Sequence, residues 1–162
     1  INNLNELKAI YNINYKAPCV LESLKNSKDK FDICISTTTL EHFTTKDLKN
    51  YLSDLKDILT NTILISAVID YSDHYSHTDK RINALNFLSY SEKEWEKYNN
   101  KYLFQNRLRH QNYKEIFEKN GYKIKEISEG PVLELPKKIC DEFDAKNKET
   151  YMLWAYFLIE IK

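Results

Sequence analysis

The sequence predicts an α/β protein built on a parallel sheet, and three neighbouring segments carry that prediction. Phe31–Ser36 is a short apolar run with β-branched side chains, which is typical of a buried strand. Apolar residues then recur at helical spacing from Leu48 to Leu59, after a capping signal at Thr44–Asp47. Thr62–Ile69 is almost continuously apolar, the pattern of a strand covered on both faces. Strand, helix and strand in this order predict a βαβ unit with parallel strands.

Weaker signals predict the other elements. Asn2–Tyr11 places its apolar residues on one stripe of a helix, and Ile13–Val20 has the pattern of a short strand that Pro18 confines to an end or an edge. After a polar stretch at Asp70–Ala84, we expect a two-turn helix following Ser91, a helix over Arg109–Asn120, a strand over Tyr122–Ser128, a short helix starting at Pro136 and a closing strand over Tyr151–Ile161. Without repeats or flexible linkers, residues 1–162 are expected to form a single domain.

The charge balance excludes some classes of partner. The 162 residues contain 24 Lys and Arg and 24 Asp and Glu, so the formal net charge is zero. A nucleic-acid module or a polybasic membrane binder would carry a basic surplus, so we expect neither nucleic acid nor a membrane as a partner. Three scattered cysteines form no metal-binding or disulfide pattern, and no apolar run approaches the length of a membrane span. We therefore expect a cytoplasmic protein.

An ordered series of short motifs runs along the chain from residue 13. Its members are Tyr15–Pro18, Phe31–Ser36, Leu40–His42, Asp70–Asp79, Asn86–Glu92, Asn106–Arg109 and Asn120–Tyr122. The series resembles the C-terminal two-thirds of class I S-adenosylmethionine-dependent methyltransferases of the broad type 11 group. The resemblance implies a Rossmann-like methyltransferase sheet, S-adenosylmethionine as the cofactor and a small-molecule substrate.

The resemblance also implies where the cofactor would lie. Ser36, Thr37 and Thr38 match the end of the family's fourth strand, beside the methionine part of the cofactor. Cys19 and Val20 stand where related sequences often carry an aspartate that contacts the adenine. The resemblance therefore implies that these two residues contact the adenine, but more weakly than a carboxylate would.

One departure from the family pattern concerns glycine. The family holds the cofactor with a glycine-rich turn after its first strand, because close backbone approach needs residues without a side chain. This chain has no glycine before Gly121, and its first twelve residues cannot supply that strand and turn. We therefore expect a sheet that lacks the family's first two strands, in a domain truncated at its N-terminus and inactive as it stands. The alternative is a degenerate relative that cannot bind the cofactor.

Two segments carry the candidate chemistry. Glu41 and His42 follow a strand end, the usual ligand side of a parallel sheet, so we assign Glu41 to substrate binding and His42 to catalysis as a proton acceptor. In the polar stretch Asp70–Asp79, we assign Asp73 to substrate binding and His74 and His77 to catalysis. We expect this stretch to form a loop over the acceptor side without a bound metal. A metal site built from Asp73, His74, His77 and Asp79 is the alternative, as is a plain solvated loop.

Two of the three arginines lie in Asn106–Arg109. Because guanidinium offers a planar fork to a carboxylate or phosphate, we assign Asn106 and Arg107 to substrate binding, as an anchor for an anionic substrate group or for Glu41. An ordinary ion pair that fastens the insertion to the following helix is the alternative.

Together these observations predict a methyltransferase that acts on a small molecule and is represented here without its N-terminal cofactor-binding part. A non-catalytic scaffold that completes its sheet with another chain, as in a homo-oligomer, is a second hypothesis, because a bare apolar edge invites pairing. A metal-dependent hydrolase that uses Asp70–Asp79 is a third.

Overall fold

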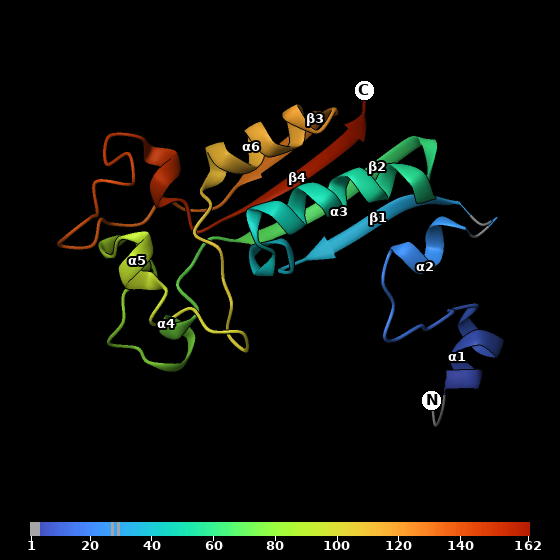
Figure 1. Ribbon diagram of the computed structural model, residues 1–162, viewed down its shortest axis with the longest axis horizontal. Helices are drawn as coiled ribbons and strands as arrows, with labels where there is room; N and C mark the ends of the chain where they lie inside the picture. Colours follow the sequence, from blue (N-terminus) through green and yellow to red (C-terminus); the bar gives the residue numbers. More distant parts are fainter. Residues whose placement is uncertain (1–3, 27, 29) are drawn as a thin grey trace.

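Four strands form one mixed sheet in the computed structural model, which describes residues 4–26, 28 and 30–162 (Figure 1). The order across the sheet is β1 (Phe31–Thr37), β2 (Leu59–Asp70), β4 (Trp154–Ile161) and β3 (Tyr122–Glu129). β1 and β2 are parallel, whereas β4 is antiparallel to both β2 and β3. The predicted βαβ unit is therefore confirmed, and the two C-terminal strands form an antiparallel pair.

Two helices cover one face of this sheet. α3 (Thr45–Ile58) buries Leu48, Leu52, Leu55 and Ile58 at the spacing expected for an amphipathic helix, and α6 (His110–Lys119) buries Tyr113, Ile116 and Phe117. Both helices lie over the same side of the sheet in Figure 1, and they pack against Ile65, Ala67, Ile69, Phe157 and Ile159. The main hydrophobic core lies between these helices and the sheet.

Thr44 caps the N-terminus of α3. Its Oγ1 accepts a hydrogen bond of 3.1 Å from the backbone N–H of Asp47. We expect Thr44→Ala to lower the free energy of unfolding by ~0.5–2 kcal/mol, because one backbone donor loses its partner. Urea unfolding of Thr44→Ala beside Thr44→Ser checks this, since serine keeps the acceptor. Equal midpoints for the alanine and serine variants would contradict the capping role.

The segment between β2 and α6 forms a lobe at one end of the sheet, on the left in Figure 1. It contains α4 (Tyr75–Thr78), the 3-10 turn η2 (Asn86–Ser89) and α5 (Glu92–Trp95), and the turn η3 (Lys148–Tyr151) joins it from the C-terminal part. A second apolar cluster holds the lobe together, built from Leu85, Phe87, Leu88, Trp95 and Tyr151. The capping box that Ser91 and Glu94 make at α5 matches the predicted helix start.

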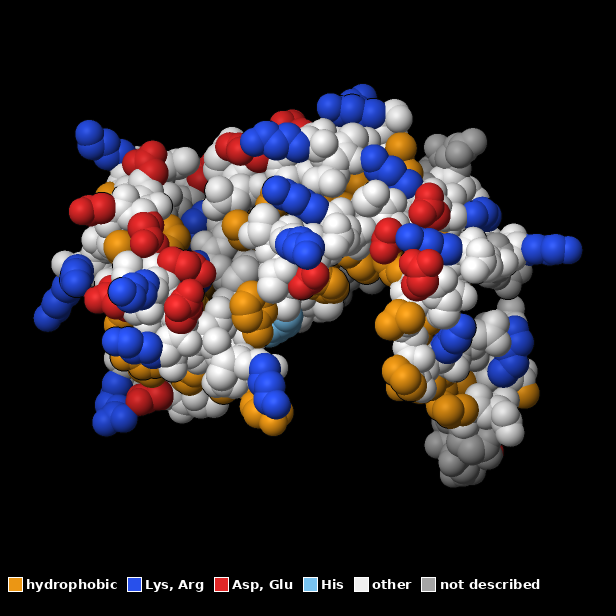
Figure 2. Space-filling model, in the orientation of Figure 1, with side chains coloured by type: hydrophobic (Ala, Val, Ile, Leu, Met, Phe, Trp, Pro, Cys, Tyr) orange, Lys and Arg blue, Asp and Glu red, His pale blue; other side chains and the backbone are white. Residues whose placement is uncertain are grey.

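The N-terminal part lies at the other end of the sheet. α1 (Leu4–Tyr11) has no buried residue and stands away from the sheet in Figure 1. α2 (Glu22–Lys25) packs Leu21 and Leu24 onto the main core, and Lys25 pairs with Asp54 of α3 at 2.8 Å. The helix predicted over Asn2–Tyr11 is confirmed from Leu4 onward, since Asn2 and Asn3 lie outside the described residues. Figure 2 shows apolar side chains gathered on this N-terminal part.

Several expected elements differ in the structure. The strand predicted over Ile13–Val20 is wrong: these residues are exposed and pair with no strand, and Pro18 cannot donate to a ladder. The helix expected at Pro136 is absent, since residues 136–147 form loops and turns. The closing strand begins at Trp154, because Tyr151 belongs to η3.

The prediction that β1 is buried is also wrong. Ile33 is 56 % exposed and Ile35 is 75 % exposed, because β1 lies at the edge of the sheet, and Ser36 is its one buried residue. β2 was predicted to be covered on both faces, but only one of its faces is buried. Ile65, Ala67 and Ile69 are buried, whereas the residues that alternate with them from Leu64 to Asp70 are partly exposed. Within the described residues, the outer edge of β1 has no strand partner, whereas β2 is paired on both sides.

No helix among the described residues is long and apolar enough to cross a membrane.

Candidate functional site

The candidate site lies where β1 and β2 end. The two strands are parallel and in register, with Thr37 opposite Val68, so their carboxyl ends meet at one edge of the sheet. The 3-10 turn η1 (Leu40–His42) follows β1, and the Asp70–Asp79 stretch follows β2. This is the edge at which open α/β sheets bind ligands. The expectation that both segments start on the same side of the sheet is confirmed.

Glu41 is the most unusual carboxylate at this edge. It is 1 % exposed, and neither of its carboxylate oxygens has a hydrogen-bond partner within the described residues. Burial raises the pKa of its carboxyl group. The backbone around it is held firmly, because its carbonyl oxygen accepts a 2.7 Å hydrogen bond from the N–H of Asn106. Glu41 is thus a fixed side chain whose charge lacks compensation.

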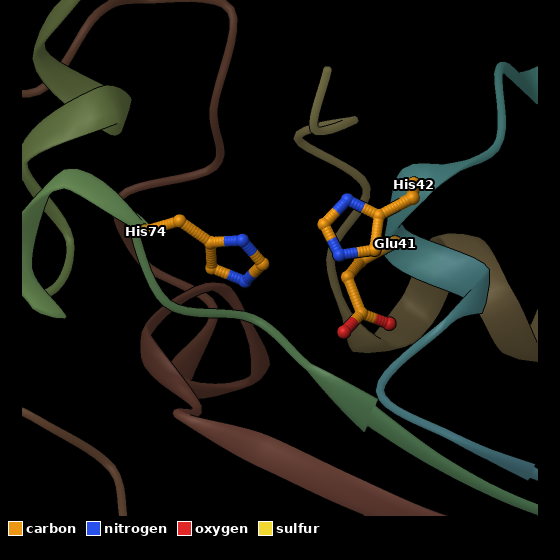
Figure 3. Close-up of side chains that lie close together, drawn as sticks. All are labelled: Glu41, His42 and His74. Atoms are coloured by element: carbon orange, nitrogen blue, oxygen red, sulfur yellow. The ribbon is translucent and has the colours of Figure 1, made fainter. Parts of the chain in front are cut away.

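Three histidines meet beside Glu41. The rings of His42 and His74 have centroids 5.0 Å apart, and His74 stacks on His77 at 4.9 Å. Figure 3 shows Glu41 and His42 on one side and His74 on the other, with the side chains close together. The three histidines predicted as catalytic therefore form one cluster, although His42 and His74 come from segments that lie far apart in the chain.

Asp70 links two of these histidines. Its Oδ2 lies 3.5 Å from Nε2 of His74 and 3.7 Å from Nε2 of His77. Its Oδ1 accepts a 2.8 Å hydrogen bond from the N–H of Ser72, and the Ser72 hydroxyl lies 2.9 Å from Nε2 of His77. The hydrogen bond with Asp70 raises the pKa of His74. Sequence reasoning had placed Asp70 only at the start of a polar stretch, although its position at a strand end is the signal that finds it.

A cavity of about 770 Å³ opens beside this cluster. It is lined by Thr38, Val68, Asp70, Ser72, Ser76, His77, Lys80, Ile82, Ala84, Leu153 and Trp154. Its size is in the range of small-molecule sites, and its walls combine apolar side chains with a few polar groups. His77 faces this cavity and also stacks on His74, so it connects the cavity with the histidine cluster.

The two other acids of the polar stretch are engaged elsewhere. Asp73 is fully buried, and its carboxylate accepts hydrogen bonds from the N–H of Tyr75 at 2.9 Å and from the amide of Asn86 at 3.1 Å. Asp79 forms an ion pair with Arg81 at 2.7 Å. Among the described residues, the groups of potential metal ligands that lie close together include neither Asp73 nor Asp79. The alternative quartet of Asp73, His74, His77 and Asp79 is therefore not assembled.

Asn106 and Arg107 hold the walls of the site. The Asn106 amide donates to the carbonyl oxygens of Leu40 at 3.1 Å and of Phe43 at 2.9 Å, which fixes the turn that carries Glu41. Arg107 lies inside the lobe and pairs with Glu92 at 2.6 Å and Glu142 at 3.3 Å. The ion pairs agree with the structural alternative for Arg107, except that they join parts of the lobe to one another rather than the lobe to α6.

The predicted cofactor residues lie in two places. Ser36 and Thr37 end β1, and Thr38, with a φ of 46°, turns the chain toward η1 while lining the cavity. A β-branched residue in this left-handed region is strained, a feature that often accompanies functional sites. Cys19 and Val20 precede α2, which lies near the opposite end of β1 in Figure 1. The structure therefore does not bring them next to Ser36–Thr38.

These residues fit one wall of an S-adenosylmethionine site. The end of β1 offers hydroxyl groups and an open edge. However, residues 1–120 contain no glycine that would let a backbone approach the cofactor closely. Residues 1–162 thus provide a cavity that could hold an acceptor, but they include no glycine-rich turn of the kind that binds the cofactor.

Comparison with known proteins supports the fold. No protein-family model and no curated protein matches the sequence. A S-adenosylmethionine-dependent methyltransferase from Clostridium acetobutylicum ATCC 824 is similar in structure over 97 % of this chain and 68 % of its own, with 11 % identity and a TM-score of 0.52. The protein thus has an α/β Rossmann-like architecture. More specifically, its fold resembles that of the methyltransferase from Clostridium acetobutylicum.

Three further solved structures are similar with TM-scores below 0.5. A SAM-dependent methyltransferase from Archaeoglobus fulgidus has a TM-score of 0.49 and 18 % identity, over 99 % of this chain and 73 % of its own. Magnesium protoporphyrin IX methyltransferase from Synechocystis PCC 6803, with bound SAH, has a TM-score of 0.43 and 12 % identity, over 85 % of this chain and 48 % of its own. A pericyclic reaction enzyme has a TM-score of 0.43 and 8 % identity, over 83 % of this chain and 27 % of its own.

Proposed function

We propose that the protein is a S-adenosylmethionine-dependent methyltransferase that methylates an oxygen, nitrogen or carbon nucleophile of a small molecule. The observation that carries this proposal is the cavity of about 770 Å³ at the carboxyl edge of a methyltransferase-like sheet, with His77 and Asp70 in its wall. In this proposal the cavity holds the acceptor. Methyl transfer depends mainly on alignment of donor and acceptor, which a pocket with rigid walls provides.

His77 is the residue that we propose as the proton acceptor. Its Nε2 faces the Ser72 hydroxyl at 2.9 Å and the Asp70 carboxylate at 3.7 Å. These two partners favour a proton on Nε2, which leaves the lone pair of Nδ1 free to take a proton from an acceptor in the cavity. His42 and His74 lie behind His77 and shape the polar end of the site.

The cofactor, when bound, supplies the methyl group. We propose that Ser36, Thr37 and Thr38 form the wall beside its methionine part, because they end β1 at the same edge as the cavity. The glycine-rich turn that would complete the grip belongs, in this proposal, to residues outside 1–162.

Titration of S-adenosylmethionine into the complete polypeptide, followed by calorimetry, tests this placement. Thr37→Trp and Thr38→Trp, made separately, should each weaken binding by at least ~10-fold, because an indole at the strand end would occupy the space of the methionine moiety. Ser53→Trp is the matched control, since Ser53 is an exposed hydroxyl residue on α3. Unchanged affinity in both threonine variants would contradict the placement. Failure of the unmodified polypeptide to bind would contradict the proposed function and favour a non-catalytic scaffold.

A further inference from the structure

Glu41, His42 and His74 form a group of potential metal ligands at the carboxyl edge of the sheet. Each offers one ligand atom, and these atoms all lie within 4.8 Å of one another. Glu41 and His42 come from η1 and His74 from the start of α4, so two separate segments contribute (Figure 3). Such convergence of imidazole and carboxylate groups is the donor set of many transition-metal sites.

The state of Glu41 is an independent sign that a cation belongs here. Its carboxylate is 99 % buried, and both oxygens are without a hydrogen-bond partner among the described residues. Burial of an ionised carboxylate is unfavourable unless a cation or several donors compensate it. A metal ion between Glu41 and the two imidazoles would supply that compensation.

The histidines are held in a way that suits metal binding. Nδ1 of His42 lies 2.8 Å from the carbonyl oxygen of Phe104, so Nδ1 carries the proton and donates it. Nε2 of His42 then has a free lone pair, the arrangement that second-shell hydrogen bonds give to metal-binding histidines. Asp70 stands in the same supporting position behind His74, with Oδ2 3.5 Å from Nε2.

Two other groups of potential ligands are less suited. In the group of Asp70, His74 and His77, Asp70 accepts from Ser72, and Nε2 of His77 faces the Ser72 hydroxyl, so these atoms already have partners. The group of His110, Glu129 and Glu149 surrounds a fully buried histidine whose Nδ1 lies 3.3 Å from the Tyr71 hydroxyl. Neither group contains a buried carboxylate with both oxygens unpaired.

We propose that Glu41, His42 and His74 bind a divalent transition-metal ion of the zinc or manganese type. Metal–ligand bonds of ~2.0–2.2 Å require the three ligand atoms to draw closer, and the exposed side chain of His42 has room to move. Three protein ligands leave a further position for water or for an oxygen of a bound molecule. Metal binding by these residues needs neither cofactor nor acceptor, so it can be measured independently of methyl transfer.

Calorimetric titration of Zn²⁺, Mn²⁺ and Mg²⁺ into chelator-treated protein tests the proposal. Zn²⁺ or Mn²⁺ should bind at one ion per chain, and Mg²⁺ should bind at least ~10-fold more weakly, because imidazole suits transition metals better. Glu41→Gln and His42→Ala should each weaken the binding of Zn²⁺ by ~10-fold or more. His77→Ala is the matched control and should bind Zn²⁺ like the unmodified protein.

Unfolding measured with and without Zn²⁺ gives a second readout. Glu41 is buried and neither of its carboxylate oxygens has a hydrogen-bond partner among the described residues, so an uncompensated charge there disfavours the folded metal-free protein. Metal-free Glu41→Gln should therefore unfold at the same or a higher urea concentration at neutral pH, whereas only the unmodified protein should gain stability from Zn²⁺. Absence of stoichiometric binding, equal binding in Glu41→Gln, or a loss confined to His77→Ala would overturn the proposal.

Discussion

Replacement of Arg109 by methionine should lower the free energy of unfolding by ~3–5 kcal/mol, the largest loss of stability that we expect from a single polar side chain. Arg109 is 4 % exposed, and none of the carboxylates that the structure describes lies within hydrogen-bond distance of it. Its guanidinium donates to three backbone carbonyls instead: Thr150 at 2.8 Å, Tyr71 at 2.7 Å and Met152 at 2.7 Å. Methionine would fill much of the volume but would leave all three buried carbonyls without this donor.

The three carbonyls belong to different parts of the fold. Tyr71 directly follows β2, Thr150 lies in η3 and Met152 precedes β4. Arg109 occupies the N-cap position of α6, where its backbone N–H donates to Oδ1 of Asn112 at 2.8 Å. Its guanidinium lies 5.2 Å from the ring of Tyr71 and 5.5 Å from the ring of Phe87. Burial lowers the pKa of Arg109 to about 10, so the group remains charged at neutral pH. The side chain thus joins the lobe to the sheet at the edge that carries the candidate site.

Urea unfolding followed by circular dichroism measures this effect. Arg109→Lys should also lose most of the stability, because one ammonium group cannot replace a planar fork that reaches three acceptors. Arg81→Met is the matched control: Arg81 pairs with Asp79 on the surface, its side chain is 91 % exposed, and its loss should leave the midpoint unchanged. Equal stability of Arg109→Met and the unmodified protein would show that the three carbonyls find other donors.

Arg109 also illustrates which features a sequence can reveal. The rarity of arginine in a lysine-rich chain draws attention to residues 106–109, and that signal is sound. The partners of Arg109 are backbone carbonyls, however, and a backbone group carries no sequence signature. For Arg107, the sequence left a substrate anchor and a structural ion pair open, and only the structure identifies Glu92 and Glu142 as its partners.

The elements with a strong periodic pattern were predictable. α3 and β2 follow from apolar spacing and from a capping residue, which are local properties of the chain. β1 was predicted as a strand but not as an exposed edge, since burial depends on which elements lie beside it. Ile13–Val20 shows the same limit, because an apolar run becomes a strand only where a neighbouring strand accepts its hydrogen bonds.

The candidate site was predictable in part. Glu41 and His42 follow from the rule that ligands bind at the carboxyl ends of parallel strands. The contact between His42 and His74 depends on how the loop after β2 folds back, held by the hydrogen bond from the N–H of His74 to Oε1 of Gln105. No spacing in the sequence encodes that return, so the histidine cluster and the cavity became visible only in three dimensions.

Removal of the His77 imidazole should produce the largest loss of activity. In the complete polypeptide, we expect His77→Ala to lower methyl transfer by ~10²–10⁴-fold, the range for loss of a general base. Because the His77 side chain is 54 % exposed, the variant should keep its stability within ~1 kcal/mol. The assay is formation of S-adenosylhomocysteine from S-adenosylmethionine, with a small-molecule extract of cells as the source of acceptor.

Two additional measurements separate proton transfer from a merely structural role. Imidazole added to the buffer should restore part of the activity of His77→Ala, because the side chain faces an open cavity that can admit the free base. The loss should appear in kcat rather than in KM, since the base acts on an acceptor that is already bound.

Ser76→Ala, a change in the wall of the same cavity, is the matched control and should retain most of the activity. A fall in kcat without rescue would leave His77 as a residue that positions the acceptor. Full activity of His77→Ala would contradict any role in the reaction and would direct attention to an acceptor that arrives already deprotonated, for which alignment alone suffices.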